Sequence, residues 1–415
     1  MTTSTDTAPA FQGDLDAVDL TDPRTFVTDT ADQLHDLWQR LRTERPVHHH
    51  RPTGGRPAFW ALTRYDDVVA VYKDNARFTS ERGNVLATLL QGGDTAAGKM
   101  LAVTDGSRHR AIRTLMLKSF SPRALSHVVE QVNKRTRDLL GQVLDQESFD
   151  YAEAIAEHIP MGTICDLMAV PPQDRQQLLD WNKQVLSADN SDGSPEDAWL
   201  ARNEILLYFS DLARHRRKKP GDDVVSTLAT AEIEGRPLTE EEIVFNCYSL
   251  IIGGDESSRM ASIGTILAFI EHPEQWRRFK AGEVTVESAT EEVLRWTTPA
   301  MHFGRRAKED VEIGGRLIPA GDIVTLWNTS ANFDETTFAD PRRYDLGRTP
   351  NKHATFGFGP HFCLGAFLGR EELKALLVAL REMVGGIESR GSAERVFSNF
   401  LYGYSSLPVS LRSAW

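Results

Sequence analysis

The sequence predicts a mainly α-helical protein with a small β portion. Long stretches of helical periodicity occupy most of the 415 residues. Short strand-like segments are confined to the N-terminal part and the last third of the chain. No internal repeat or low-complexity linker divides the sequence, so we expect one folded unit over residues 26–415, preceded by a disordered lead-in over residues 1–25.

The longest predicted helix opens with a capping box, Thr239-Glu240-Glu241-Glu242, and runs to about Glu271. At 1.5 Å per residue it would be roughly 50 Å long and cross the molecule. Its mostly apolar sides suit a buried central helix. Helical patterns also cover residues 31–42, 66–75, 109–119, 126–143, 152–168 (kinked at Pro160), 173–187, 196–218, 284–295 and 363–384.

Strand-like alternation begins with residues 46–51 and 58–63, which are joined by a turn with two glycines. His48, His49 and His50 are consecutive in the first segment, and consecutive strand residues point to opposite faces, so these three are poorly placed to share a metal. A glycine-rich loop is expected at 81–98 and a flexible lid segment at 188–195. Further strand-like segments cover residues 302–307, 311–313, 316–318, 323–328 and 396–411.

Composition and charge exclude several classes of protein. Hydrophobic content of 40% and charged content of 26% are ordinary for a soluble globular protein, and a net charge of −12 argues against a nucleic-acid partner. No apolar run is long enough for a transmembrane helix, and the N-terminus lacks the features of a signal peptide. Cys165, Cys247 and Cys363 are too few for a disulfide scaffold, which indicates a reducing cytoplasm.

Cys363 lies in a loop of glycines, a proline and aromatic residues (356–365), and a helical pattern starts directly behind it. Gly357 and Gly359 allow positive φ or close approach of the backbone to a flat ligand. Free amide groups and the helix N-terminus would favour the thiolate, the form that ligates metals. A buried structural cysteine is the alternative. The spacing of glycine, aromatic and histidine residues favours a metal ligand.

The pattern Phe356-x-x-Gly359-x-His361-x-Cys363-x-Gly365 resembles the haem-ligand signature of the cytochrome P450 family. The resemblance extends over about residues 30–411. It implies the cytochrome P450 fold, in which a long central helix lies over haem b (iron-protoporphyrin IX) and the cysteine loop lies beneath it. Cys363 would be the axial thiolate, a ligand that favours O–O cleavage, with Phe356 and Gly357 beside the cofactor.

A polar stretch interrupts the predicted central helix at Gly253-Gly254-Asp255-Glu256-Ser257-Ser258. Each glycine costs a helix about 1 kcal/mol relative to alanine, and buried polar groups add a desolvation cost. A kinked helix with a solvated face is one interpretation. The stretch also resembles the family's oxygen-activation motif. On that resemblance Gly253 and Gly254 make room for O2, and Glu256 belongs to a proton route. Ser257 takes a position where the family usually has threonine.

Four cations would suit the two haem propionates, because buried carboxylates need paired donors. His109 and Arg113 are four residues apart near a predicted helix start, although the prolines usual before this pair in the family are absent. Arg305 matches the family's strand arginine, with Arg306 as the adjacent alternative, and His361 lies within the cysteine motif. Any one of them alone could be an ordinary surface cation.

Glu292 and Arg295 share one face of a predicted helix at i, i+3 spacing. A surface ion pair would contribute little. The pair resembles the family's structural Glu–Arg pair, which holds the haem-binding core together.

By position in the family, substrate contacts come from four regions of the chain. The lining would mix apolar and polar groups and suit a mid-sized, oxygenated molecule, although the same residues could be plain core. The candidates are Leu89, Ser249, Leu250, Gly253, His302, Phe303, Asn399, Phe400 and Tyr402.

The resemblance implies a soluble bacterial monooxygenase that inserts one oxygen atom from O2 into an organic substrate by hydroxylation or epoxidation. Electrons would come from NAD(P)H through a ferredoxin reductase and a ferredoxin that docks near Cys363, with Lys352 and Arg370 as candidate contacts. We expect a tailoring step in natural-product biosynthesis, on a free or carrier-protein-bound substrate. The alternatives are a haem-containing binding or recruitment protein without turnover, and a thiolate electron-transfer protein.

Overall fold

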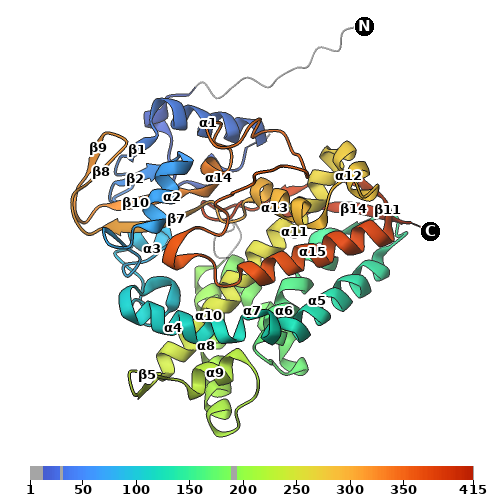
Figure 1. The fold of residues 1–415 in the computed structure, drawn as a ribbon, viewed down its shortest axis with the longest axis horizontal. Coiled ribbons are helices and arrows are strands. Elements are labelled where there is room, and N and C mark those ends of the chain that lie inside the picture. The colour runs from blue at the N-terminus through green and yellow to red at the C-terminus, as the bar shows by residue number, and fades with distance from the viewer. Residues whose placement is uncertain (1–12, 29–30, 188–193, 415) are drawn as a thin grey trace.

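The computed structural model describes residues 13–28, 31–187 and 194–414. Helices make up most of it, and strands lie on two sides of the molecule, around β1 (Val47–His50) on one side and at β11 (Val384–Ser389) and β14 (Pro408–Ser413) on the other (Figure 1). The prediction of a mainly helical protein with a small β portion is therefore confirmed. Within the described residues, no helix is both long and apolar enough to span a membrane.

The largest sheet has five strands in the order β1-β2-β10-β7-β3. Strands β2 and β10 are parallel, and the other neighbours are antiparallel. Apolar side chains alternate between the two faces: Val324 and Leu326 pack with α2, whereas Ile323 and Trp327 pack with α1. The strands are β1 (Val47–His50), β2 (Phe59–Leu62), β3 (Phe78–Thr79), β7 (His302–Ala307) and β10 (Ile323–Trp327).

The remaining strands form small antiparallel sheets. Their pairings are β11-β14-β4, β12-β13, β5-β6 and β8-β9. Their bounds are β4 (Phe149–Asp150), β5 (Glu232–Ile233), β6 (Arg236–Pro237), β8 (Val311–Ile313), β9 (Arg316–Ile318), β11 (Val384–Ser389), β12 (Glu394–Arg395), β13 (Tyr404–Ser406) and β14 (Pro408–Ser413).

The largest hydrophobic core is built mainly by the helices between residues 106 and 297 and by the helix over residues 366–383. The first three helices pack in two smaller clusters with the five-stranded sheet. The predicted loop over 81–98 contains a short helix, α3. The helices are α1 (Ala31–Glu44), α2 (Tyr65–Lys73), α3 (Leu86–Leu90), α4 (Gly106–Ser119), α5 (Pro122–Val143), α6 (His158–Leu167), α7 (Arg175–Ser187), α8 (Pro195–Lys218) and α9 (Val224–Thr230). Of the expected lid segment, residues 188–193 lie outside the described residues.

The predicted helix over 152–168 starts as a π-helical turn (Ala152–Ala156) and continues as α6. The break precedes Pro160, which lies in the first turn of α6, where a missing backbone N–H is tolerated. The later helices are α10 (Glu240–Gly254), α11 (Glu256–Glu271), α12 (Pro273–Lys280), α13 (Val286–Thr297), α14 (Asn328–Ala331) and α15 (Ala366–Met383).

The predicted central helix is interrupted, which corrects the expectation of one continuous helix. It starts with the predicted capping box at Thr239, ends as α10 at Gly254, and resumes as α11 at Glu256. Asp255 between them has φ −81° and ψ −71°. Two glycines weaken the helix at this point.

The N-terminal segment corrects the predicted lead-in, because residues 13–25 are folded. Two 3₁₀ turns (Leu15–Ala17 and Pro23–Thr25) place Leu15 and Leu20 in the core beside α1. The Leu20 amide donates to His50 Nε2 at 3.1 Å. Burial of these leucines accounts for the ordered segment.

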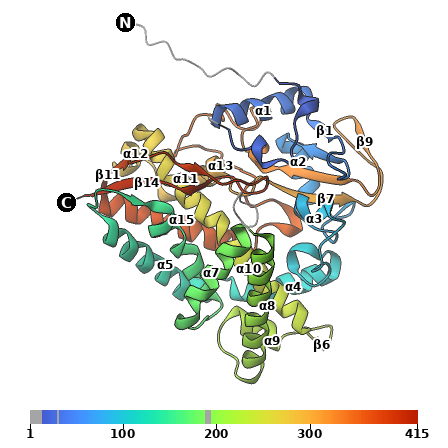
Figure 2. The ribbon, with the colours of Figure 1, turned by 180° about the vertical axis from the view of Figure 1, so that it is seen from behind.

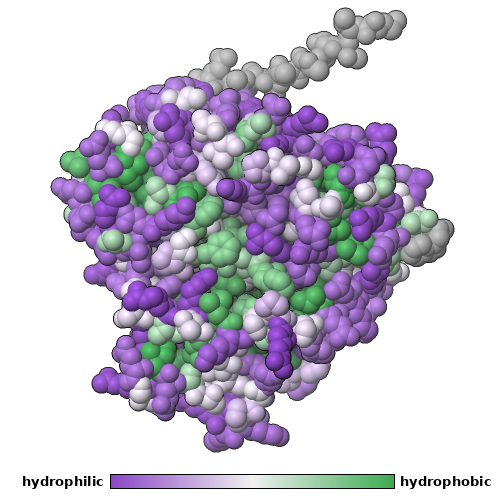
Figure 3. Space-filling model, viewed as in Figure 1, coloured by the Kyte–Doolittle hydropathy of each residue, from purple (hydrophilic) through white to green (hydrophobic). Residues whose placement is uncertain are grey.

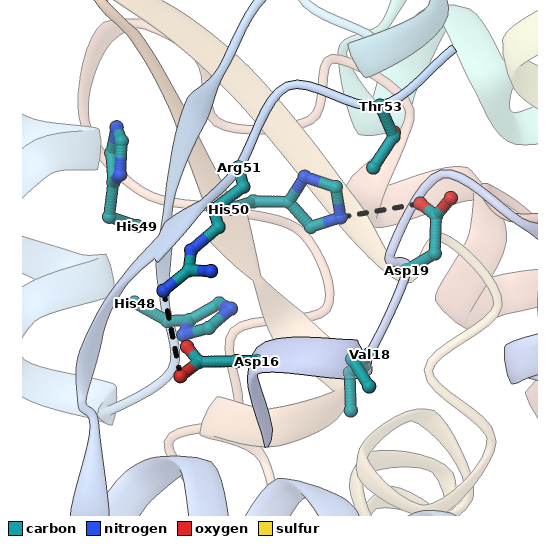
Figure 4. A pocket seen from close by; sticks show the side chains of 9 residues that line it. Asp16, Val18, Asp19, His48, His49, His50, Arg51 and Thr53 are labelled. Atoms are coloured by element: carbon teal, nitrogen blue, oxygen red, sulfur yellow. Dashed lines mark ion pairs between the residues drawn. The ribbon is translucent and has the colours of Figure 1, made fainter. Parts of the chain in front are cut away.

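The three histidines of β1 point to two faces of the strand, as expected (Figure 4). His48 and His50 are buried on the face toward the N-terminal segment, where Asp16 and Asp19 help to line a small pocket (Figure 4). His49 is exposed on the opposite face, with its ring 4.5 Å from that of Trp60. No group of three or more metal-ligating side chains occurs in the described part of the chain.

Candidate active site

The cysteine loop is held closed by its own backbone and by α2. The Cys363 amide donates to the Phe356 carbonyl at 2.9 Å. Gly357 and Gly359 have φ of 64° and 70°, and a Cβ at Gly359 would lie 2.5 Å from the Tyr72 carbonyl oxygen. Both positions therefore need glycine for its positive φ. Their close approach is to Tyr72 of α2.

The side chain of Cys363 is accessible to solvent, although many protein atoms surround it. Burial raises the pKa of its thiol, while the Gly365 amide and the nearby Arg113 and Arg370 oppose that shift. The Gly365 amide favours the thiolate, as expected of the amide groups here, but burial has the larger effect in the chain by itself. A metal ion would supply the missing stabilisation, because a coordinated thiol is deprotonated.

Arg305 is a buried cation without a carboxylate partner in the described part of the chain. Its side chain lies on β7 with 5% exposure, over the ring of Tyr72 at 5.6 Å. The hydrogen bond found for its guanidinium goes to the carbonyl of Gly304, at 2.7 Å. Burial lowers the pKa of Arg305. A buried guanidinium normally requires an anion beside it, so this position suits a bound carboxylate.

His109 and His361 stack beside each other, with ring centroids 4.3 Å apart. His361 Nε2 lies 2.7 Å from Asp105 Oδ1, so its Nε2 is already engaged by a protein carboxylate. His109 Nε2 is buried without a partner, and burial lowers the pKa of this imidazole to about 4. Arg113 donates to the Phe362 carbonyl at 2.6 Å. Of these three side chains, His109 has an unused ring nitrogen.

The start of α4 departs from the family pattern in a way that the structure explains. The carboxylate of Asp105 accepts hydrogen bonds from Thr79 Oγ1 at 2.7 Å and the Ser80 amide at 2.8 Å. Gly106 then begins the helix with φ of 66°. Asp105 thus connects α4 to β3 and, through His361, to the cysteine loop.

These features fit a haem. Arg305 and His109 offer an unpaired buried guanidinium and an unpaired buried nitrogen for its carboxylates. Cys363 offers an accessible sulfur that receives an amide hydrogen bond from Gly365. The donor set therefore combines a soft ligand for iron with polar groups for an anionic rim.

One face of α10 and α11 is not fully buried. Phe245, Ser249, Gly253 and Ser257 are all partly or fully exposed, and positions four apart share a helix face. A Cβ at Gly253 would meet no atom within 4 Å, so the helix borders open space there. At Gly254 a Cβ would lie 2.9 Å from Ile164 Cδ1, so Gly254 permits packing on α6, and its place beside the cofactor stays a prediction.

Hydroxyls and acids gather where α10 meets α11. Glu256 is buried and pairs with Arg259 at 3.1 Å. Ser257 Oγ donates to the Gly253 carbonyl at 3.2 Å, while Ser258 Oγ donates to Glu372 Oε2 at 2.6 Å. Burial raises the pKa of Glu372 to about 7, against the effect of that hydrogen bond.

Sequence reasoning missed Glu372. The residue lies on α15 between Leu368 and Leu376, four positions from each, on the buried face of the helix. An acid on an apolar stripe is a detectable signal, because an unpaired buried carboxylate is costly.

Glu292 and Arg295 form a fully buried pair, with two Arg295–Glu292 hydrogen bonds of 2.9 Å. Arg348 and Asn351 also donate to Glu292, and Arg295 donates to the carbonyls of two loop residues. This network joins α13 to the segment before the cysteine loop, which fits a structural role for the pair.

Two predicted substrate contacts lie in the core instead. Leu89 and His302 are 1% and 0% exposed. His302 packs on Trp327, on the opposite face of β7 from Phe303, because neighbouring strand residues alternate. Both nitrogens of His302 lack partners, and burial lowers its pKa to about 3.

The other substrate candidates are partly or fully exposed. The rings of Phe303 and Phe400 meet at 5.8 Å. Leu250 packs against the main core, and Tyr402 lies under the guanidinium of Arg395, while Asn399 donates to the carbonyl of Thr21.

The surface over the cysteine loop is partly apolar. Leu117, Phe362 and Phe367 are exposed there, and Figure 3 shows apolar residues near the middle of this face. Arg370 is held by Glu291 in two hydrogen bonds of 2.6 and 2.9 Å, so it is less free than expected. Lys352 is exposed and makes no ion pair with the described residues.

Comparisons with known proteins agree with this geometry. The cytochrome P450 family model matches residues 285–381. The chain is 46% identical to cytochrome P450 NovI of Streptomyces niveus, over 96% of this chain and 97% of that protein. It is 31% identical to linalool 8-monooxygenase of Pseudomonas putida, over 91% and 95%.

Solved structures show the same fold. P450 OxyD, which is involved in the biosynthesis of vancomycin-type antibiotics, superposes with a TM-score of 0.87 at 35% identity, covering 96% of this chain and all of OxyD. The bacillaene polyketide synthase cytochrome P450 PksS of Bacillus subtilis has a TM-score of 0.81 at 31% identity, covering 91% and 97%.

Fold and site together define an oxidoreductase of the monooxygenase class. The chain belongs to the cytochrome P450 family. Members of this family carry a haem with a cysteine thiolate ligand and use O2.

Proposed function

We propose that the protein hydroxylates or epoxidises an intermediate of natural-product biosynthesis, with Cys363 as the axial ligand of its haem. The accessible sulfur of Cys363, deep among protein atoms in a loop closed on Phe356, is the observation that carries the proposal. We infer that the open space at Gly253 and the space before Cys363 are continuous and hold the cofactor.

In this proposal, Arg305 and His109 bind the haem carboxylates directly. Arg113 and His361 lie close by, with Arg113 donating to the loop carbonyl of Phe362 and His361 held by Asp105. A bound haem would supply reductive activation of O2 and transfer of one oxygen atom to substrate.

The chain's own contribution on the oxygen side is proton supply. Ser257 is proposed to present its hydroxyl to the open space at Gly253, in exchange for its bond to the Gly253 carbonyl. Glu256 is proposed to pass protons from solvent toward it, and the Ser258–Glu372 pair is proposed to hold a proton nearby. A carboxyl with a pKa near 7 can both accept and release a proton at neutral pH.

Natural-product tailoring is supported by two relatives whose names connect them to such pathways, OxyD and PksS. For this chain we propose a mid-sized, oxygenated substrate, free or bound to a carrier protein, that contacts Ser249, Phe303 and Phe400. Their mixture of hydroxyl and aromatic groups suits such a molecule.

We propose a small acidic ferredoxin, reduced by a ferredoxin reductase with NAD(P)H, as electron donor. The exposed apolar residues Phe362 and Phe367 lie beside Cys363 in the sequence, and the exposed cations Arg110, Lys118 and Lys352 can meet acidic side chains. The cytoplasmic location expected from the cysteine content is part of the same proposal.

The test is turnover with a surrogate ferredoxin and reductase. Candidate substrates, free and carrier-bound, are first screened by their effect on the haem absorbance. Those that change the spectrum are incubated with O2 and NADPH, and products are analysed by mass spectrometry. A product heavier by one oxygen atom is expected. Spectral change with every binder but no product would instead support a binding or recruitment protein.

A further inference from the structure

The junction of α10 and α11 is tied to α7 by one pair of buried side chains. Asn182 Nδ2 donates a hydrogen bond to Asp255 Oδ2. Asn182 is 0% exposed and Asp255 is 3% exposed, so water does not solvate either group. Figure 2 shows α7 beside α10 in the view from behind.

Two oxygens of this pair remain unmatched. Asp255 Oδ1 and Asn182 Oδ1 are both buried without a hydrogen-bond partner. A carboxylate can only accept, and an amide oxygen can only accept, so an ionised Asp255 leaves both atoms unsatisfied. A proton on Oδ1 would let Asp255 donate to Asn182 Oδ1, because rotation about the last torsion of each side chain is soft. One proton therefore satisfies both atoms.

The surrounding charges favour the same state. Glu256 and Arg259 of α11 pair with each other, and the positive charge of Arg259 opposes protonation of Asp255 less than the charge of Glu256 favours it. Glu372 of α15 is a further acid nearby, and Cys165 of α6 is a neutral thiol. Burial, followed by the charge of Glu256, raises the pKa of Asp255 well above its usual value.

We propose that Asp255 is a protonated acid that forms a reciprocal hydrogen-bonded pair with Asn182 and thereby fixes α7 to the helix junction beside Glu256 and Ser257. Asp255 is then a positioning residue. It fixes the backbone that positions the Ser257 hydroxyl. A movement of α7 would therefore also move that hydroxyl. Only this last consequence rests on the proposed monooxygenase function, since the protonation state is a property of the folded chain.

The protonation state is tested by infrared spectroscopy of the haem-loaded protein at pH 7. The difference between wild type and Asp255→Asn should contain the carbonyl stretch of a protonated carboxylic acid, which Asn cannot give. A difference that contains only carboxylate bands would overturn the proposal. Recording both proteins in a Glu372→Gln background removes the contribution of the neighbouring Glu372.

Stability against pH provides a second test. The folded pKa of Asp255 is raised, so its favourable contribution is complete below the unfolded pKa and is lost as pH rises toward the folded pKa. Asp255→Asn keeps two reciprocal hydrogen bonds and has no proton to lose. The unfolding equilibrium constant of wild type relative to this variant should therefore rise by up to about tenfold per pH unit between pH 5 and 7. A ratio independent of pH would contradict the proposal.

The positioning role is tested by the fraction of consumed O2 that appears as product. Asn182→Leu should lower this fraction several-fold, whereas Asp255→Asn should keep most of it. Loss of product in both variants would make Asp255 a proton donor, and an unchanged fraction in Asn182→Leu would remove the positioning role. The infrared result stands even if no substrate is turned over, so failure of the proposed function is distinguishable.

Discussion

The two sides of the proposed haem site draw their residues from the chain in different ways. On the cysteine side, loop residues 356–365 are consecutive, and the loop is closed by a hydrogen bond from the Cys363 amide to the Phe356 carbonyl. On the oxygen side, the junction at Asp255 depends on Asn182, 73 positions away, and Ser258 depends on Glu372, 114 positions away. A local motif closes the cysteine loop, which distant residues such as Tyr72 and Asp105 then hold in place, whereas the pairs on the oxygen side form only through tertiary packing.

This difference predicts where single substitutions act. Changes on the cysteine side should remove the ligand without disturbing the fold, because Cys363 is accessible. Changes on the oxygen side should alter protonation and stability together, because the acids there are buried.

The largest effect on turnover is expected at Glu256, the carboxylate proposed to pass protons toward Ser257. Glu256→Gln removes a proton carrier, and general acid–base catalysis contributes about 10²- to 10⁴-fold to a rate. Product formation should fall by at least about 100-fold. Glu287→Gln, an exposed acid on α13, is the control and should stay near wild type. Similar losses in both variants would remove the special role of Glu256.

Glu372 should make stability depend on pH. Its folded pKa of about 7 exceeds the usual 4.5, so its contribution is complete below the unfolded pKa and is lost as pH rises through the folded pKa. Relative to Glu372→Gln, wild type should lose about 3 kcal/mol of unfolding free energy as pH rises from the unfolded pKa to about 7. Urea titrations across this range measure the difference. A constant difference would show that folding does not shift the pKa of Glu372.

Arg305 should control how firmly haem is retained. A charge-assisted hydrogen bond contributes about 1.5–3 kcal/mol, so Arg305→Leu should weaken haem binding about 10- to 100-fold. Haem transfer to apomyoglobin measures this loss. The matched control is Arg306→Leu, because Arg306 points to the other face of β7 and donates to the Gly321 carbonyl. A larger loss of haem affinity in Arg306→Leu would show that Arg306, and not Arg305, binds the haem carboxylate.

Ser257 should produce the smallest effect. Ser257→Thr adds the methyl group that restricts the hydroxyl to fewer rotamers, which should lower the peroxide released per product by about twofold. Peroxide and product are measured in the same reaction. No change, or more peroxide, would show that rotation of this hydroxyl does not determine how much peroxide is released.

The same contrast explains what the sequence could predict. Periodicity predicted β7, β8 and β9 with the bounds that the structure shows. The family resemblance selected Arg305, which has no carboxylate partner in the described part of the chain, and His109, whose buried Nε2 has no hydrogen-bond partner. The two glycines before Asp255 indicated a possible kink there, but the contact with Asn182 was not predictable, because it comes from another helix.

Two misassigned substrate residues have a similar cause. His302 and Phe303 are neighbours in sequence, and a shift of one residue along a strand exchanges the two faces. His302 therefore joined the core with Trp327, and Leu89 packs beneath Gly304 on the same face. Position in the family pattern identified the segment, but the pairing of β7 with β10 decided which side chains face away from the core.

The central claim, thiolate ligation by Cys363, is tested most directly by the absorbance of the reduced, carbon-monoxide-bound protein. The account predicts the red-shifted Soret band of thiolate ligation in wild type, retained in Cys247→Ala, whose side chain is buried, and lost in Cys363→Ala. An unshifted band in wild type, or a red-shifted band that survives in Cys363→Ala, would contradict it.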